Sequence, residues 1–199
     1  MRDNKKEAII TIPNIISLAR LVLSPVFLYF ILVRKTQEAF IIFLIAISTD
    51  FFDGAVARIF KQKSNLGALL DPIGDKVLMT LSYIVLSIPS VNNPNSIPLW
   101  LTAVVIGRDL YIVFGAAMAF KLMGRKKFPP TLTGKASTVF QMAVPLTVLF
   151  FNMTHVQSGL LGPLFLITLI ITLLSGIHYT AIGMKWLRES KSNIKKEND

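Results

Sequence analysis

The sequence predicts an all-α integral membrane protein with six transmembrane helices and a short N-terminal interfacial segment. First, 53% of the 199 residues are hydrophobic and only 16% are charged, and the mean hydropathy of +0.60 is too high for an ordinary soluble domain. Second, six apolar runs are each long enough to cross a bilayer, which takes about 20 residues. Third, these runs are continuous and lack the alternating pattern of a membrane β-barrel.

Polar breaks separate the expected spans in chain order. The segment 34–37 (RKTQ) ends the first run, and the proline- and asparagine-rich segment 89–98 (PSVNNPNSIP) ends the third. The basic segment 124–134 (GRKKFPPTLTG) ends the fourth, and the polar turn 152–159 (NMTHVQSG) ends the fifth. The spans are therefore expected at 14–33, 39–60, 67–88, 98–121, 133–153 and 160–186.

We expect one membrane domain over residues 1–199, in which 1–13 is an interfacial lead-in and 188–199 a solvated basic tail. The chain has no cysteine, which excludes disulfides, thiolate metal sites and a cysteine nucleophile.

The distribution of basic residues predicts the orientation of the bundle. The net charge is +10, and the lysines and arginines flank apolar runs, which indicates anionic lipid headgroups as partners and not nucleic acid. Basic residues concentrate at both ends of the chain and in the second and fourth loops, whereas the loops of the other side hold only Arg34 and Lys35. Both termini, and the turn between spans two and three, are therefore expected in the cytoplasm.

Four aspartates around the second turn form the candidate functional site. Asp50 and Asp53 are three residues apart and Asp71 and Asp75 four apart, so that each pair shares one face of a helix. The turn between the two helices is expected to bring the four carboxylates together near the cytoplasmic membrane surface. Such a cluster repels itself unless cations neutralise it. Carboxylates without histidine or cysteine favour Mg²⁺ or Mn²⁺ over Zn²⁺.

The residues beside the aspartates suit a phosphate-bearing ligand. Gly54, Ala57 and Gly67 leave room for a ligand to approach the backbone, and the guanidinium of Arg58 can grip a phosphate with two hydrogen bonds. The residues alone thus indicate a metal-dependent reaction on a phosphate ester at the membrane surface. In one alternative the aspartates only cap helices and pair with basic loop residues. In another the chain is a proton- or cation-coupled transporter, although its carboxylates gather at one surface.

The spacing of these residues resembles the signature of the CDP-alcohol phosphotransferase family at every fixed position: Asp50-x2-Asp53-Gly54-x2-Ala57-Arg58-x8-Gly67-x3-Asp71-x3-Asp75. The segment 12–25 (IPNIISLARLVLSP) is similar to the family's opening span. The segment 134–141 (GKASTVFQ) is similar to the fifth-span motif of its phosphatidylglycerophosphate and cardiolipin synthases. The resemblance implies a homodimeric six-helix membrane enzyme that transfers a substituted phosphoryl group from a CDP-linked donor to an alcohol and releases CMP.

The resemblance also implies roles for individual residues. Asp50, Asp53 and Asp71 would hold two divalent cations, Mg²⁺ or Mn²⁺, on the donor pyrophosphate. Asp75 would join this metal site and act as the base on the acceptor hydroxyl. The CDP site would be lined by Gly54, Ala57, Arg58 and Gly67. The donor would be CDP-diacylglycerol, and the active site would lie at the cytoplasmic face of a bacterial-type inner or plasma membrane.

The acceptor alcohol is expected to be bound by Arg108, Lys135 and Thr138. Phosphatidylglycerophosphate synthases usually have a further arginine after the fourth-span Arg-Glu and a second lysine in the fifth-span motif. Here Asp109 follows Arg108, the later arginine is missing, and Ser137 replaces the lysine. These changes remove positive charge and favour a CMP-forming cardiolipin synthase, whose acceptor is phosphatidylglycerol. Phosphatidylglycerophosphate synthase, with glycerol-3-phosphate as acceptor, is the alternative.

Three other polar side chains within the spans leave their roles open. For Arg20 the alternatives are a contact with lipid headgroups and a place in the site. Arg108 could instead pair with a carboxylate on another helix. His178 and Tyr179 lie in the middle of the sixth span, where packing or a hydrogen bond between helices is expected.

Overall fold

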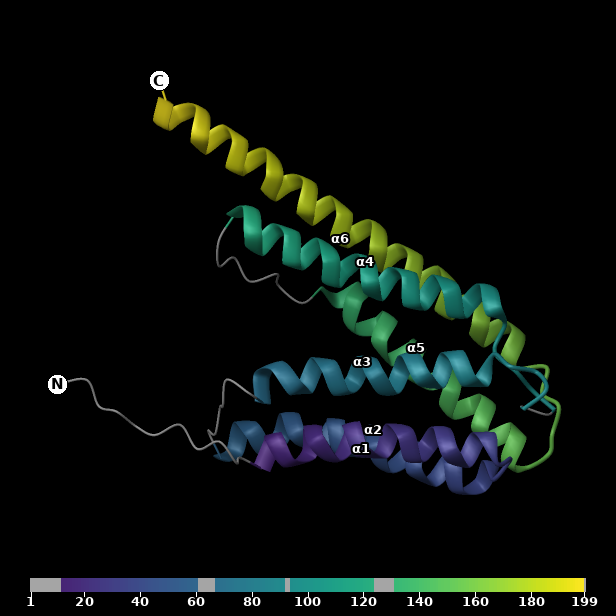
Figure 1. Cartoon of the computed structure of the whole chain (residues 1–199). Coiled ribbons are helices and arrows are strands. Elements are labelled where there is room, and N and C mark those ends of the chain that lie inside the picture. The colour runs from purple at the N-terminus through teal and green to yellow at the C-terminus, as the bar shows by residue number, and fades with distance from the viewer. Residues whose placement is uncertain (1–11, 61–66, 92–93, 124–130, 199) are drawn as a thin grey trace. The chain divides into compact units, whose positions relative to one another are not determined.

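The computed structural model describes residues 12–60, 67–91, 94–123 and 131–198, and within them the secondary structure is entirely α-helical. The helices are α1 (Ile12–Leu32), α2 (Thr36–Phe60), α3 (Gly67–Leu86), α4 (Leu99–Met123), α5 (Leu132–Met153) and α6 (Leu161–Asn198) (Figure 1). The prediction of an all-α chain is confirmed, and the helix limits lie within three residues of the predicted ones except at the last end.

The sixth helix continues through the basic segment that was expected as a solvated tail, so that 188–198 has helical backbone. The segment is rich in Lys, Arg and Glu, which are good helix formers. At the other end, α1 begins at Ile12, and the rest of the predicted interfacial lead-in lies outside the described residues.

The chain divides into two compact units, each described by itself below. Unit 1 comprises Met1–Ile97 and Pro145–Ser158, and unit 2 comprises Pro98–Val144 and Gly159–Asp199. The division therefore passes through α5 at Pro145, a proline inside this helix.

In unit 1, α1 packs against both α2 and α3 (Figure 1). Its buried residues follow each other at intervals of four, three and four: Arg20, Ser24, Phe27 and Ile31. The ring of Phe27 contacts that of Phe43 in α2, with 5.4 Å between their centroids. Since a helix repeats every 3.6 residues, these intervals define one face of α1, and this face forms the interior of the unit.

Two helices of unit 1 end in the same way. After α1, the amide of Lys35 donates to the carbonyl of Phe30 (2.9 Å) and the amide of Arg34 to that of Ile31 (3.0 Å). These bonds form a Schellman motif, in which Arg34 adopts the left-handed conformation with φ of 60°. His155 ends α5 with the same bonds and a φ of 55°. The first motif turns the chain sharply from α1 into α2.

A buried pair of asparagines connects the segment between α3 and α4 with the last turn of α5. The amide and side-chain nitrogens of Asn95 both donate to Oδ1 of Asn152 (2.9 Å each), and Nδ2 of Asn152 donates back to the carbonyl of Asn95 (2.8 Å). Nδ2 of Asn95 also donates to the carbonyl of Val156 (2.8 Å). The pair thus ties the segment before α4 to the end of α5.

In unit 2, α4 packs against α6 (Figure 1). Polar side chains at intervals of four and three are fully buried along α6: Thr168, Thr172 and Ser175. Large apolar side chains cover the outer faces instead, among them Phe114 of α4 (71% exposed) and Ile177 of α6 (67% exposed). The middle of α6 therefore buries polar side chains, while large apolar side chains lie on the outer faces of α4 and α6.

Two helices of the described chain are long and apolar enough to cross a membrane, Leu132–Met153 and Leu161–Lys185. Shorter apolar stretches lie in the first three helices, at Leu18–Leu32, Thr36–Thr49 and Lys76–Leu86. The helices are thus consistent with a membrane protein.

Candidate functional site

The aspartate signature occupies two consecutive helices of unit 1. Asp50 and Asp53 lie toward the end of α2, whereas Asp71 and Asp75 lie in the first turns of α3, which begins at Gly67. The side chains of these aspartates, and those of Ala57 and Arg58, lie outside the described residues. The predicted metal and CDP contacts therefore stay predictions.

The positions of the aspartates in their helices continue buried faces. In α2 the fully buried residues Ala39, Phe43 and Ala46 are four and three residues apart, and the next positions of this series are 50, 53 and 57. In α3 the same holds for Leu78, Ser82 and Val85, whose series extends backwards to 75 and 71. All four aspartates therefore occupy positions on the same helix faces that, farther along α2 and α3, form the interior of unit 1.

The chemistry of this donor set fits hard divalent cations. Its four members are carboxylates, and signature positions 50–75 contain no histidine or cysteine. Among the described side chains no group of three or more His, Cys, Asp or Glu could hold a metal ion. The sequence and the helix positions are thus the observations that support a metal site at the aspartates.

Arg108 is the centre of a polar cluster in unit 2. Its side chain is 9% exposed, and Nη1 donates to Oδ1 of Asp109 at 2.8 Å. Nη2 donates to the hydroxyl of Ser175 in α6. The buried Nε has no hydrogen-bond partner among the described residues. The alternative in which Arg108 pairs with a carboxylate on another helix is thus wrong, because the carboxylate that it contacts, that of Asp109, belongs to the next residue of α4.

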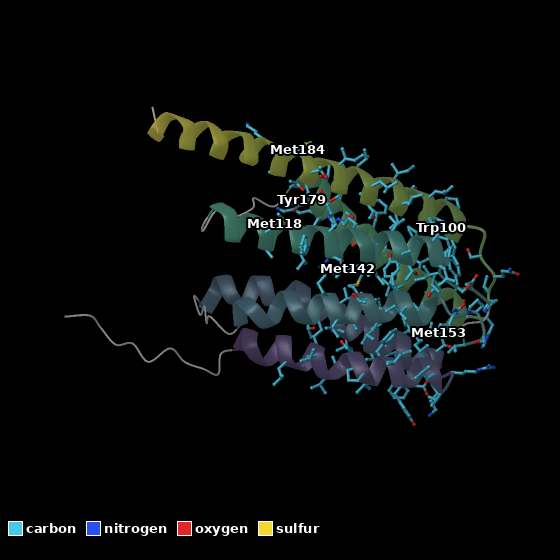
Figure 2. The ribbon with its side chains drawn as sticks, turned by 45° about the horizontal axis from the view of Figure 1, so that its top comes forward. Trp100, Met118, Met142, Met153, Tyr179 and Met184 are labelled. Atoms are coloured by element: carbon cyan, nitrogen blue, oxygen red, sulfur yellow. The ribbon has the colours of Figure 1, made fainter. Side chains whose placement is uncertain are left out.

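An aromatic ring holds the other side of this guanidinium. The Cζ atom of Arg108 lies 5.8 Å from the ring centroid of Tyr179, in the range of a cation–π interaction. Figure 2 labels Tyr179 on α6. The ring also packs against the start of α5, where a Cβ atom on Gly134 would stand 3.0 Å from Oη and 3.1 Å from Cε2 of Tyr179. Tyr179 therefore connects the start of α5 to the guanidinium on α4.

Further hydrogen bonds join the first turns of α5 to α6. Nε2 of Gln141 donates to the hydroxyls of Ser137 (3.1 Å) and Thr172 (3.3 Å), and all three residues are buried. Near the start of α5, the hydroxyl of Thr133 and Nδ1 of His178 lie 3.0 Å apart. The hydrogen bond between helices that was expected at His178 is thus confirmed.

The other two predicted acceptor residues lie on the exposed side of α5. Lys135 and Thr138 are both exposed, and the hydroxyl of Thr138 donates to the carbonyl of Gly134 in its own helix (3.1 Å). In the described part of the chain, neither forms a hydrogen bond or ion pair with Arg108. Gly134, the neighbour of Lys135 in the chain, packs against the ring of Tyr179, and this ring in turn contacts Arg108. Tyr179 is thus the described link between Arg108 and the start of α5.

The sequence interpretation missed Ser175 and Gly134 as parts of this cluster, and Tyr179 as its link. One signal for them was present in the sequence. Within the apolar α6, polar residues recur at intervals of four, three and four: Thr168, Thr172, Ser175 and Tyr179. A polar stripe along an apolar helix indicates a face that packs against protein.

Helices with apolar outer faces, and a carboxylate signature across α2 and α3, suit a helical membrane enzyme that acts on phosphate esters. Residues 10–180 match the model of the CDP-alcohol phosphatidyltransferase family. The chain belongs to the CDP-alcohol phosphatidyltransferase family, and it is an enzyme of this class.

Similar proteins of known name fall under two enzyme names. A CDP-diacylglycerol–glycerol-3-phosphate 3-phosphatidyltransferase of Aquifex aeolicus is 33% identical over 179 residues, which cover 88% of this chain and 97% of the relative. A CMP-forming cardiolipin synthase of Homo sapiens is 30% identical over 91% of this chain and 64% of the relative. One of Streptomyces coelicolor is 33% identical over 72% of this chain and 67% of the relative.

Proposed function

We propose that this enzyme is a membrane-embedded phosphatidyltransferase that moves the phosphatidyl group of CDP-diacylglycerol to a glycerol-type alcohol and releases CMP. The observation that carries this proposal is the aspartate signature at positions 50–75, together with the family match over residues 10–180. In the reaction the acceptor hydroxyl attacks the phosphorus that carries the diacylglycerol, the bond from this phosphorus to the CMP oxygen breaks, and the hydroxyl proton passes to a base.

The six helices are proposed to cross the membrane with both termini in the cytoplasm, where the aspartates would lie. Two helices meet the length and hydropathy of a span, and exposed apolar side chains on α4 and α6 suit contact with lipid. The basic residues of the ends and of the even-numbered loops support the orientation. A homodimer is part of the proposal through the family resemblance alone.

The aspartates are assigned the roles that the resemblance implies. Asp50, Asp53, Asp71 and Asp75 would hold two divalent cations, Mg²⁺ or Mn²⁺, which when bound would neutralise the donor pyrophosphate. Asp75 would also accept the proton of the acceptor hydroxyl. The small residues Gly54, Ala57 and Gly67, together with Arg58, would line the CDP site.

The acceptor is proposed to be phosphatidylglycerol, which would make the enzyme a CMP-forming cardiolipin synthase. The carboxylate of Asp109 lies 2.8 Å from Nη1 of Arg108 and neutralises the buried guanidinium. The hydrogen-bond partner of this guanidinium on α6, Ser175, is uncharged. A neutral polar cluster suits the hydroxyls of a headgroup better than a phosphomonoester, whose burial demands net positive charge. Lys135 and Thr138 remain assigned to the acceptor by the resemblance.

Glycerol-3-phosphate is the second candidate acceptor. The Aquifex aeolicus relative, whose name states this acceptor, aligns over 97% of its own length. Lys135 supplies an exposed positive charge at the start of α5 that could meet a phosphate. A transporter coupled to protons or cations is the candidate of another class, and its support is limited to the carboxylates near apolar segments.

A single assay separates these functions. The purified protein receives CDP-diacylglycerol with Mg²⁺ or Mn²⁺, and CMP release is measured with phosphatidylglycerol, glycerol-3-phosphate or no acceptor. Release with phosphatidylglycerol supports a cardiolipin synthase, and release with glycerol-3-phosphate alone transfers the proposal to the second acceptor. If no alcohol yields CMP, the phosphatidyltransferase proposal fails.

A further inference from the structure

The largest fully buried side chain among the described residues is that of Arg20, in α1. It is 1% exposed, although arginine keeps its charge at any physiological pH. Of the two alternatives for Arg20, contact with lipid headgroups is excluded, because this burial is within the protein itself. A buried guanidinium is destabilising unless an anion lies nearby.

Helix α1 packs against α2 and α3, the two helices that carry the aspartate signature. Arg20 belongs to the buried face of α1 that continues through Ser24 and Phe27. The hydroxyl of Ser24 donates to the carbonyl of Arg20 (2.9 Å), so that this neighbour serves the backbone and carries no charge.

The contact between Phe27 and Phe43 sets the register of α1 against α2. The short turn at Arg34 makes the two helices antiparallel, and the two rings lie 5.4 Å apart. Arg20 lies seven residues before Phe27, and Asp50 lies seven residues after Phe43. Both steps cover about 10 Å along antiparallel axes. Arg20 and Asp50 therefore occupy the same level of the helix pair.

The carboxylates of unit 1 outside the aspartate signature are not candidates for a partner at the level of Arg20. Glu38 lies in the first turn of α2, about 18 Å of helix away from position 50, and its carboxylate lies 3.7 Å from Nζ of Lys35. Asp3 and Glu7 precede the described residues. The carboxylates on the two helices that α1 contacts are otherwise those of the signature.

We propose that Arg20 is a positioning residue for the aspartate signature, a fixed buried cation that neutralises and holds Asp50. The inference rests on the proposed function, in which these aspartates bind divalent cations. A fixed positive charge would reduce the repulsion within the carboxylate cluster before cations bind. Arg20 thus stabilises the folded metal-free enzyme and keeps one ligand in place for the metal.

The test is the thermal unfolding of the full-length protein in detergent, with and without Mn²⁺. Arg20→Met should lower the metal-free unfolding temperature on the order of 10 °C, because it leaves the carboxylate of Asp50 without its cation. Mn²⁺ should raise the unfolding temperature more in Arg20→Met than in the wild type, because the metal replaces the missing charge. Arg20→Lys should recover part of the loss.

Phe27→Leu is the matched control on the same buried face, and it should lose the same number of degrees with and without Mn²⁺. If Arg20→Met behaves like Phe27→Leu, Arg20 is a packing residue and the proposal is overturned. A rise in the KM for CDP-diacylglycerol with no change in the Mn²⁺ effect also overturns it, because the guanidinium then serves the donor.

The pairing with Asp50 is tested by a double-mutant cycle that needs neither metal nor turnover. Without metal, Asp50→Asn should raise the unfolding temperature in the Arg20→Met background but not in the wild type, where it removes the partner of the buried guanidinium. Equal effects in both backgrounds contradict the pair. The cycle also serves if Arg20→Met alone does not fold, since the double variant should then recover folded protein. A wild type that releases no CMP with any acceptor contradicts the proposed function and leaves this result intact.

Discussion

The guanidinium of Arg108 lies over the ring of Tyr179, with 5.8 Å from Cζ to the ring centroid. The same ring packs against Gly134 at the start of α5. Tyr179 is therefore in a position to hold Arg108, and the proposed role of Arg108 in acceptor binding can be measured through it.

Tyr179→Leu should raise the KM for the acceptor roughly five- to thirty-fold, because a desolvated cation–π contact contributes about 1–2 kcal/mol. Tyr179→Phe keeps the aromatic face and should remain close to the wild type. Steady-state CMP release at varied acceptor concentration provides the measurement, with the KM for CDP-diacylglycerol as the quantity that should not change. Equal losses in Tyr179→Leu and Tyr179→Phe would show that the hydroxyl matters and the stacking does not.

Gly134→Ala should disturb the same contact from the other side. The added Cβ would lie 2.9 Å from Oγ1 of Thr131 and 3.0 Å from Oη of Tyr179, which forces the ring to shift. We expect a higher acceptor KM, measured by the same assay. Gly183→Ala is the control, because it lies one turn beyond Tyr179 in α6 and its Cβ would meet no atom within 4 Å. That control should be neutral or slightly stabilising, and an equal rise in its KM would contradict the prediction.

Asn152→Ala should destabilise the protein by about 2–4 kcal/mol, since it leaves the buried amide, Nδ2 and carbonyl of Asn95 without these partners. Thermal unfolding provides the measurement, and kcat below the unfolding temperature should stay unchanged. Gln157→Ala removes an exposed amide from the same segment and should change stability by less than about 0.5 kcal/mol. Similar unfolding temperatures for the two variants would show that the asparagine pair contributes little.

The positions of the helices could be predicted because apolar runs and polar breaks carry that information locally. The first span, predicted at 14–33, is Ile12–Leu32, and the fifth, predicted at 133–153, is Leu132–Met153. The last helix was predicted too short because the end of an apolar run marks a change of solvent and not the end of a helix. The helix continues while the residues remain good helix formers, here to Asn198.

The site could be predicted only where its residues are close in sequence. The aspartate signature is such a case, because intervals of three and four place residues on one face of a helix. The contact of Tyr179 with Arg108 joins residues 71 positions apart, and the burial of Arg20 depends on how α1 packs. Both follow from tertiary packing, which a single sequence does not specify.

Asp75→Asn should lower CMP release by roughly 10²–10⁴-fold if Asp75 is the base, because an amide cannot accept the hydroxyl proton. Much of the donor binding should remain, as three aspartates of the signature are unchanged. CMP release and the equilibrium binding of CDP-diacylglycerol are measured in parallel. Glu38→Gln, an exposed carboxamide substitution in the first turn of α2, is the control. Full activity of Asp75→Asn would refute the assignment of the base.

Asp109→Asn should shift the choice of acceptor toward glycerol-3-phosphate. The carboxylate of Asp109 neutralises Arg108 at 2.8 Å, and its replacement by an amide leaves a net positive charge in a buried cluster. A phosphomonoester gains more from this charge than the headgroup of phosphatidylglycerol. The ratio of the two kcat/KM values should therefore change roughly tenfold in favour of glycerol-3-phosphate.

The ratio is independent of the fraction of folded enzyme, so that a loss of stability does not affect it. Ser175→Ala, which removes a neutral partner of the same guanidinium, should leave the ratio within about twofold of the wild type, because the net charge is unchanged. A ratio that stays constant in Asp109→Asn would show that the charge of this cluster does not select the acceptor.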